Sequence, residues 1–309
     1  MNIIEVNNLT KSFDKLTAVD NLCLSVAEGE IFGLVGPDGA GKTTTMRLLT
    51  SIMDPTSGNV AVAGFNTVSD AERVKEHIGY MSQRFGLYAD LTVAENIDFY
   101  ADIYQVPKDG RTERTEKLLS FSNLAPFKNR LAGKLSGGMK QKLGLACALI
   151  HKPSVLFLDE PTNGVDPVSR REFWRLLYQL LKEKVTIFVS TAYLDEAERC
   201  NRVALIHKGN LLAIGTPDEI KKLMHGAVME IRVSEPRHVT ELLQANLNNA
   251  SISLFGDRIH LVAEKIEETY KQAAKIISSN GIDLLSCRTI EPALEDVFIS
   301  ILTSEKDKT

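Results

Sequence analysis

The stretch Gly36-Pro-Asp-Gly-Ala-Gly-Lys-Thr-Thr44 fits the pattern G-x-x-x-x-G-K-[ST]. Gly39 and Gly41 let the backbone wrap closely around an anion, and a following helix would direct its positive end to the same point. Lys42 supplies a cation for the β- and γ-phosphates of a nucleotide, and Thr43 supplies a hydroxyl for Mg²⁺. The predicted phosphate-contacting residues are Gly36, Pro37, Asp38, Gly39, Ala40, Gly41, Lys42, Thr43 and Thr44.

The segments around this loop alternate between strand and helix signals. An apolar run over 29–36 precedes the loop, and 42–52 is helix-like. This placement favours a phosphate loop over a flexible glycine turn that matches by chance. Two more apolar runs, 154–159 and 185–190, are separated by a helix-like segment over 169–184. Alternation of this kind predicts a largely parallel α/β sheet.

The rest of the chain predicts an insertion and an appendage. Helical signals dominate from about 84 to 150, which indicates a helical subdomain inserted into a nucleotide-binding domain over 1–225. After Gly215-Thr216-Pro217 the character changes, and residues 226–309 predict a small α+β domain.

Composition narrows the function classes. The 309 residues carry a net charge of −4, which gives no support for nucleic-acid binding. No apolar run approaches the roughly 18–20 residues needed to cross a bilayer, and the N-terminus does not resemble a signal peptide. We therefore expect a cytoplasmic protein whose membrane role, if any, needs a partner. The four cysteines are widely spaced and are predicted to be buried, reduced thiols.

A pair of carboxylates follows the second apolar run. Asp159 can help to hold Mg²⁺, and Glu160 is placed to orient or deprotonate an attacking water. The alternative is a pair of turn-capping acids.

A second glycine turn, Ser136-Gly137-Gly138, comes directly before a helix-like segment. It predicts another anion-binding helix N-terminus, although an ordinary serine N-cap would look the same. One nucleotide has little use for two such helix ends from one chain. Two chains that face each other, each lending its second turn to the other's phosphate loop, would use both.

These motifs, in this order and spacing, resemble the ATP-binding subunit of an ABC transporter, with a P-loop NTPase fold. The resemblance covers about the first 220 residues and implies ATP and Mg²⁺ as ligands. It implies that Phe13 stacks on adenine, that Gln83 reaches Mg²⁺ and the water, and that Asp166 contacts the opposite subunit. It also assigns the Ser136 turn to the partner's ATP. The alternatives are a core aromatic for Phe13, a solvated amide for Gln83 and a turn for Asp166.

The resemblance fails at one position. The family pattern after the strand at 185–190 is Ser-Thr-His, and that histidine contacts the γ-phosphate, whereas this chain has Ser190-Thr191-Ala192. Loss of one donor to a transition state commonly costs about 10²–10³ in rate. We expect a site that binds ATP and turns over slowly, unless Tyr193, Thr191 or a water compensates. We also expect a partner ATPase domain that has its own histidine.

The sequence resembles one branch more closely, the first ATPase domain of tandem-ATPase ABC-2 exporters of the multidrug type, through its phosphate loop, its Ser-Gly-Gly turn and "YLDEAE" (193–198). This implies separate ABC-2 membrane subunits, a second ATPase domain as partner and a peripheral position on the cytoplasmic face of the inner or plasma membrane.

We expect the loop with Gln83, Phe85, Leu87 and Tyr88 to dock the membrane partner. The alternatives are a soluble ABC ATPase without a transporter and a regulatory subunit that binds ATP without hydrolysis.

Overall fold

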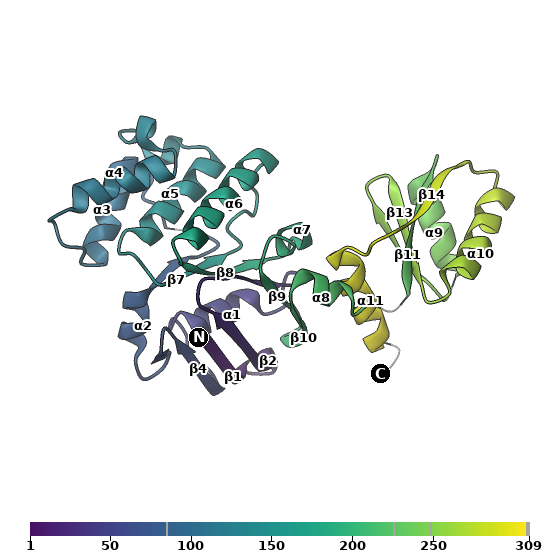
Figure 1. The fold of residues 1–309 in the computed structure, drawn as a ribbon, viewed down its shortest axis with the longest axis horizontal. Coiled ribbons are helices and arrows are strands. Elements are labelled where there is room, and N and C mark those ends of the chain that lie inside the picture. The colour runs from purple at the N-terminus through teal and green to yellow at the C-terminus, as the bar shows by residue number, and fades with distance from the viewer. Residues whose placement is uncertain (85, 225, 248, 307–309) are drawn as a thin grey trace. The chain divides into compact units, whose positions relative to one another are not determined.

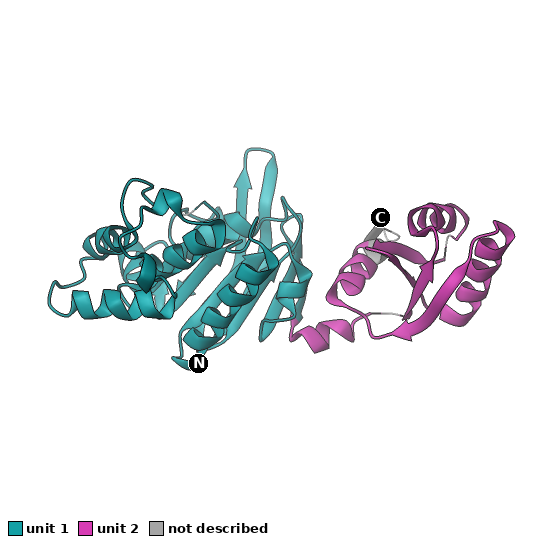
Figure 2. Ribbon diagram, turned by 90° about the horizontal axis from the view of Figure 1, so that it is seen from above, with its two compact units in different colours: residues 1–214 teal, residues 215–309 magenta. Residues whose placement is uncertain are grey.

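A computed structural model describes residues 1–84, 86–224, 226–247 and 249–306. The chain divides into two compact units, Met1–Ile214 and Gly215–Thr309 (Figure 2). The sequence analysis placed the boundary later, between residues 225 and 226. The segment between the two boundaries forms α8 (Pro217–Lys221), which packs against α11 (Leu294–Lys306) and so lies with the C-terminal unit.

A six-stranded sheet forms the centre of the first unit (Figure 1). Its strands are β3 (Ile31–Val35), β6 (Ile78–Met81), β7 (Val155–Asp159), β8 (Thr186–Thr191), β9 (Arg202–His207) and β10 (Asn210–Gly215), in the order β10-β9-β3-β8-β7-β6. β3 pairs in parallel with β8 and β9, and β7 pairs in parallel with β6 and β8. The carboxyl ends of β3, β7 and β8 therefore meet at one edge, where Gly36, Glu160 and Ala192 follow them.

A second, antiparallel sheet consists of β1 (Asn2–Phe13), β2 (Leu16–Ala27), β4 (Ser57–Val62) and β5 (Phe65–Asn66), in the order β2-β1-β4-β5. Helix α1 (Lys42–Leu49) contributes Met46, Leu48 and Leu49 to a core that both sheets share. Burial of these three side chains fixes the helix, and with it the phosphate loop, between the two sheets.

The predicted helical insertion forms α3 (Val93–Ile103), α4 (Arg111–Phe121) and α5 (Gly137–Leu149), which gather beside the central sheet in Figure 1. The insertion has its own apolar core. Thr92 and Glu95 form a capping box that starts α3. The other helices of this unit are α2 (Ala71–His77), α6 (Pro167–Lys182) and α7 (Leu194–Ala197), and two single 3-10 turns lie at Ala125–Phe127 and Ala132–Lys134.

The second unit runs β11 (Ala227–Val233), α9 (Pro236–Asn246), β12 (Ser251–Phe255), β13 (Arg258–Ala263), α10 (Ile266–Ser279) and β14 (Leu284–Ile290), followed by α11. Its antiparallel sheet has the order β12-β13-β11-β14. The β-α-β-β-α-β succession with this order is the ferredoxin-like arrangement. The α/β class with a small α+β appendage is thus confirmed.

The prediction of buried cysteines is half wrong. Cys147 and Cys200 are buried, and burial raises the pKa of both thiols, but Cys23 and Cys287 are exposed. Cys23 lies on β2, where alternate side chains face away from the core, and Cys287 lies on β14, the edge strand of its sheet, where most residues are exposed.

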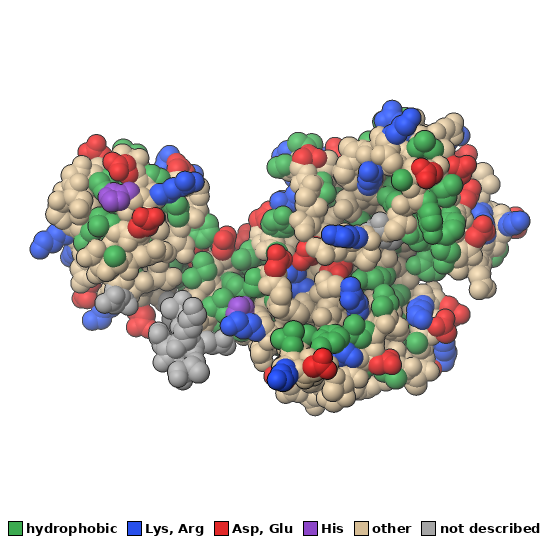
Figure 3. Space-filling view, turned by 180° about the vertical axis from the view of Figure 1, so that it is seen from behind, with side chains coloured by type: hydrophobic (Ala, Val, Ile, Leu, Met, Phe, Trp, Pro, Cys, Tyr) green, Lys and Arg blue, Asp and Glu red, His purple; other side chains and the backbone are tan. Residues whose placement is uncertain are grey.

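The surface mixes side-chain types. Figure 3 shows acidic, basic and hydrophobic side chains interspersed over the face that it draws. Among the helices that the structure describes, none combines the length and the apolar character needed to span a bilayer.

Candidate nucleotide site

The phosphate loop leaves the N-terminal end of α1 open. No side chain caps the helix at Gly41, whose φ is 105°. A Cβ atom at Gly41 would lie 2.3 Å from the carbonyl oxygen of Ala18, so both the conformation and the space require glycine. The first N–H groups of a helix have no partner within the helix, and here they are available to an anion.

Lys42 is held inside this loop. Its Nζ donates to the carbonyl oxygens of Gly36 at 2.8 Å and Pro37 at 3.0 Å, and it forms an ion pair with Glu160 at 3.0 Å. The side chain of Lys42 is only 4% exposed. The cation is therefore fixed at the mouth of the loop, at the carboxyl end of the sheet.

Asp159 offers an oxygen for a metal ion. Its Oδ1 accepts hydrogen bonds from Ser190 Oγ at 2.6 Å and from Thr43 Oγ1 at 3.3 Å. Its Oδ2 is buried without a hydrogen-bond partner. Burial raises the pKa of this carboxyl group, which shows that its charge is poorly compensated. A carboxylate oxygen in this condition, beside the Thr43 hydroxyl, fits Mg²⁺, which prefers oxygen ligands.

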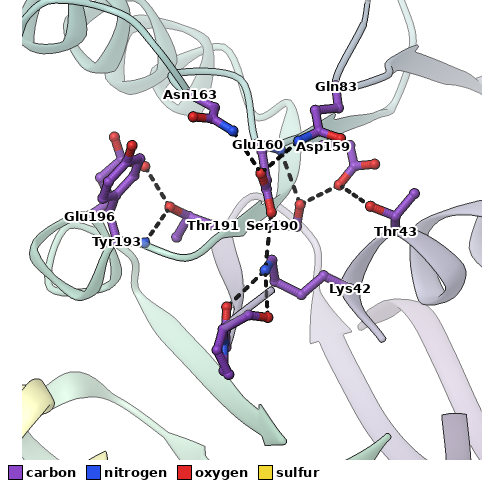
Figure 4. A network of polar contacts seen from close by, with 12 residues as sticks. Lys42, Thr43, Gln83, Asp159, Glu160, Asn163, Ser190, Thr191, Tyr193 and Glu196 are labelled. Atoms are coloured by element: carbon purple, nitrogen blue, oxygen red, sulfur yellow. Dashed lines mark hydrogen bonds and ion pairs between the residues drawn. The ribbon is translucent and has the colours of Figure 1, made fainter. Parts of the chain in front are cut away.

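Glu160 stands at the centre of the site (Figure 4). Besides Lys42, its carboxylate accepts hydrogen bonds from Gln83 Nε2 at 3.0 Å and Asn163 Nδ2 at 3.2 Å. Its φ of 48° lies in the left-handed region, which a non-glycine residue seldom adopts and which often marks a functional site. The sequence analysis missed Asn163, although its position three residues after Glu160 in the same turn could have suggested it.

The other predicted residues lie away from this network. Ser136 caps α5 through Met139 N, as its N-cap alternative predicted, and Asp166 caps α6 through Val168 N and Ser169 N, where the alternative was a turn. These roles leave both residues exposed at the start of a helix. Phe13 is 41% exposed at the tip of the β1–β2 hairpin, so the alternative of a buried core aromatic is wrong. No hydrogen bond or ion pair joins these three residues to the phosphate loop within the described residues.

The loop that follows β8 at Ala192 and Tyr193 is called the switch loop, and its alanine side chain carries no polar group. Ala192 lies with Glu160 and Asn163 on the wall of a pocket of about 220 Å³. The Thr191 hydroxyl donates to Glu196 at 2.9 Å and accepts from Tyr193 N at 3.0 Å. The Tyr193 ring lies under the guanidinium of Arg170, 4.3 Å from its centroid. Figure 4 shows Thr191, Tyr193 and Glu196 grouped on the side away from Lys42.

Glu196 ties the switch loop to its surroundings, a role that the sequence analysis missed. Its buried carboxylate accepts from Thr162 Oγ1 at 2.5 Å, from Thr191, and from Arg170 Nε at 3.1 Å. Arg170 lies on α6, the helix that Asp166 caps. A single carboxylate therefore joins the loop after Glu160, the end of β8 and α6.

Comparisons with known proteins agree with this geometry. A family model described as "ABC transporter" matches residues 19–163. The bacitracin transport ATP-binding protein BcrA of Bacillus licheniformis is 35% identical over 97% of this chain and 97% of its own length. The chain belongs to the ABC transporter ATP-binding family. It is thus an ABC-type ATPase by family, as the motifs predict.

Two further kinds of relative are informative. The probable multidrug ABC transporter ATP-binding protein YbhF of Escherichia coli is 43% identical over 97% of this chain, and the chain spans 52% of its length. Among solved structures, cbiO1 from Clostridium perfringens has 27% identity and a TM-score of 0.66, over 71% of this chain and 90% of its own. A dimeric ATP-binding cassette, MJ0796 bound to ADP and Pi, has 26% identity and a TM-score of 0.63, over 69% of this chain and 98% of its own.

Proposed function

We propose that this chain is an ATP-hydrolysing subunit that powers export through separate membrane-spanning subunits of the ABC-2 type. It would lie on the cytoplasmic face of the inner or plasma membrane. The relatives named for multidrug and bacitracin transport support a drug-like substrate class. The observation that carries the proposal is the cluster of Lys42, Asp159 and Glu160 at the open end of α1.

The roles within the site follow from the contacts. Lys42 and the N-terminal end of α1 would hold the phosphates, and Thr43, Asp159 and Gln83 would hold Mg²⁺, which neutralises phosphate charge when bound. Glu160 would release Lys42 to the phosphates and accept a proton from the attacking water. Phe13 has the exposure that adenine stacking needs.

The second part of the proposal is an unequal pair of sites. The MJ0796 cassette is a dimer, and the exposure of the Ser136 turn and Asp166 leaves both accessible to an opposite ATPase domain. The Ala192 side chain offers no donor to a nucleotide, the Thr191 hydroxyl bonds Glu196, and the Tyr193 ring lies against Arg170. We infer that the site on this chain binds ATP but turns it over slowly, and that the partner domain carries its own histidine.

The proposed membrane contact lies near the start of the helical insertion. Leu87 and Ala89 line a pocket of about 240 Å³ together with Gly133 and Gln141, and Tyr88 is 47% exposed. Gln83 links this segment to Glu160, so a partner seated there would sense the nucleotide site. Phe85, which we expected in the same patch, lies outside the described residues.

The test is to isolate this chain from membranes with its native partners and to replace Glu160 by Gln in this chain alone. Co-purification of a protein with several membrane spans and a second ATPase domain is expected. The variant should still bind ATP and should lower transport-coupled hydrolysis only in part. Unchanged hydrolysis would favour a regulatory subunit, and the absence of any membrane partner would favour a soluble ABC ATPase.

A further inference from the structure

We propose that a second pocket of the ATPase unit, on the far side of the switch loop from Glu160, binds a small phosphate-bearing anion. The pocket has a volume of about 370 Å³. It lies between the first two turns of α6 and the segment around α7, and Asp195, Glu196 and Arg199 come from that segment. The nucleotide roles proposed above use none of the basic side chains in this pocket.

One face of α6 supplies most of the wall. Pro167, Arg170, Arg171 and Trp174 follow each other at the spacing i, i+3, i+4, i+7, which places them on one side of the helix. They lie in the N-terminal half of a 16-residue helix whose first N–H groups are already capped by Asp166. The donors available to an anion here are therefore the side chains.

Trp174 is the unusual member of this wall. The side chain is buried, with 1% of its surface exposed, and its indole Nε1 has no hydrogen-bond partner. An unpaired buried donor costs roughly 1–3 kcal/mol. Because Trp174 lines the pocket, its indole signal will report on what binds there.

The charges of the pocket favour an anion. Three arginines and two carboxylates line it. Arg170 already pairs with Glu196 at 3.0 Å and with Asp195 at 3.4 Å. Arg171 and Arg199 are exposed, and in the described part of the chain no carboxylate lies within ion-pair distance of either. Two uncommitted guanidinium groups match the several acceptor oxygens of a phosphate.

Arg170 links this pocket to the nucleotide site. Its guanidinium faces the pocket, bonds Glu196 and covers Tyr193, and Tyr193 also lines the pocket on the Glu160 side. An anion beside Arg170 would compete with Glu196 for its donors. Occupancy would therefore loosen the tie between the switch loop and α6.

Trp174 provides the probe, because it is the only tryptophan of the chain. Inorganic phosphate is titrated into the ¹⁵N-labelled chain at constant ionic strength, and the indole ¹H–¹⁵N signal is followed. We expect a saturable shift. The double variant Arg171→Gln, Arg199→Gln should weaken binding by about tenfold or more. Arg175→Gln, on the same helix but outside the pocket, should bind like the wild type.

Two further arms separate this site from other phosphate sites. In Lys42→Ala the indole shift should persist, because the phosphate loop is a different site. Glycerol phosphate in solution and vesicles of phosphatidylcholine with phosphatidic acid distinguish a free ligand from a lipid headgroup, and binding of either supports the proposal. The proposal is overturned if no probe shifts the indole signal saturably, if Lys42→Ala abolishes the shift, or if the double variant binds as tightly as Arg175→Gln. Unfolding temperatures of both arginine variants confirm that each is folded.

Discussion

The ends of β7 and β8 lie side by side in the same parallel sheet, yet they contribute very differently to the nucleotide site. β7 ends in Asp159 and leads into Glu160, whose polar atoms bond Lys42, Thr43, Gln83, Asn163 and Ser190. β8 ends in Ser190 and Thr191 and leads into Ala192. Ser190 supports Asp159, the Thr191 hydroxyl bonds Glu196, and the Ala192 side chain has no polar group.

This difference separates two properties that are usually found together. Binding of a nucleotide depends on the loop, the cation and the metal ligands, and these lie at or just after the ends of β3 and β7. Fast turnover needs donors on both sides of the reacting phosphate, because only interactions made in the transition state accelerate the chemistry. The two strand ends therefore predict a site that binds ATP well and hydrolyses it slowly.

The largest effect is expected from Ala192→His. An imidazole at this position restores a donor on the β8 side, and the turnover of the purified chain should rise about 10²–10³-fold with little change in ATP affinity. Steady-state phosphate release and equilibrium ATP binding measure the two quantities. Ala192→Phe, a ring without nitrogen, is the control and should give no gain; an equal gain in both variants would mean that loop packing limits the rate.

Removal of the cation that pairs with Glu160 should mainly affect binding. Lys42→Ala leaves the phosphates without a charge-assisted donor, and ATP affinity should fall about 10- to 100-fold. Fluorescent nucleotide titration checks this, with exposed Lys182→Ala as the control. Wild-type affinity in Lys42→Ala would show that the loop amides alone determine binding.

Asp159→Asn should remove the metal dependence of binding. If Mg²⁺ raises ATP affinity through this carboxylate, the affinity of the variant for Mg²⁺ should fall about tenfold, as Mg²⁺ titration at fixed ATP would measure. The free chain should unfold at a higher temperature, because a carboxyl group with a raised pKa is destabilised in its charged form at neutral pH, and the amide carries no charge. A variant that keeps its Mg²⁺ response would assign the metal to other ligands.

The smallest effect is expected from Tyr193→Phe. The Tyr193 ring is stacked on Arg170, so loss of its hydroxyl should leave the turnover of the wild-type chain unchanged. Phosphate release at saturating ATP is the measurement. A clear drop in rate would show that Tyr193 replaces the missing histidine, and the contrast between the two strand ends would then disappear.

The sequence predicted the β7 side better than the β8 side. The phosphate loop and the Asp159–Glu160 pair are local patterns, because residues adjacent in sequence act together at the end of a strand. Glu196 and Arg170 are 26 residues apart and meet only after β8 pairs with β7 and α6 packs on the sheet. Neither Glu196 nor Arg170 belongs to a short sequence motif that would predict its role.

Short elements were also beyond the sequence patterns. β5 spans two residues and α7 spans four, too few to show a period of 2.0 or 3.6. The antiparallel pairing of β1 with β4 is a contact between distant segments, which alternation within one strand cannot reveal. The exposure of Cys287 follows from the position of β14 at the edge of its sheet, which depends on the order of strands.

The most direct test of the central claim is the identity of the nucleotide that remains bound. The wild-type chain and Ala192→His are each mixed in excess with MgATP, quenched with acid at matched times, and analysed for ATP and ADP. The contrast between the strand ends predicts that the wild-type chain still holds mostly ATP when Ala192→His holds mostly ADP. Equal conversion to ADP by both proteins would contradict it, because alanine at position 192 would then not slow hydrolysis.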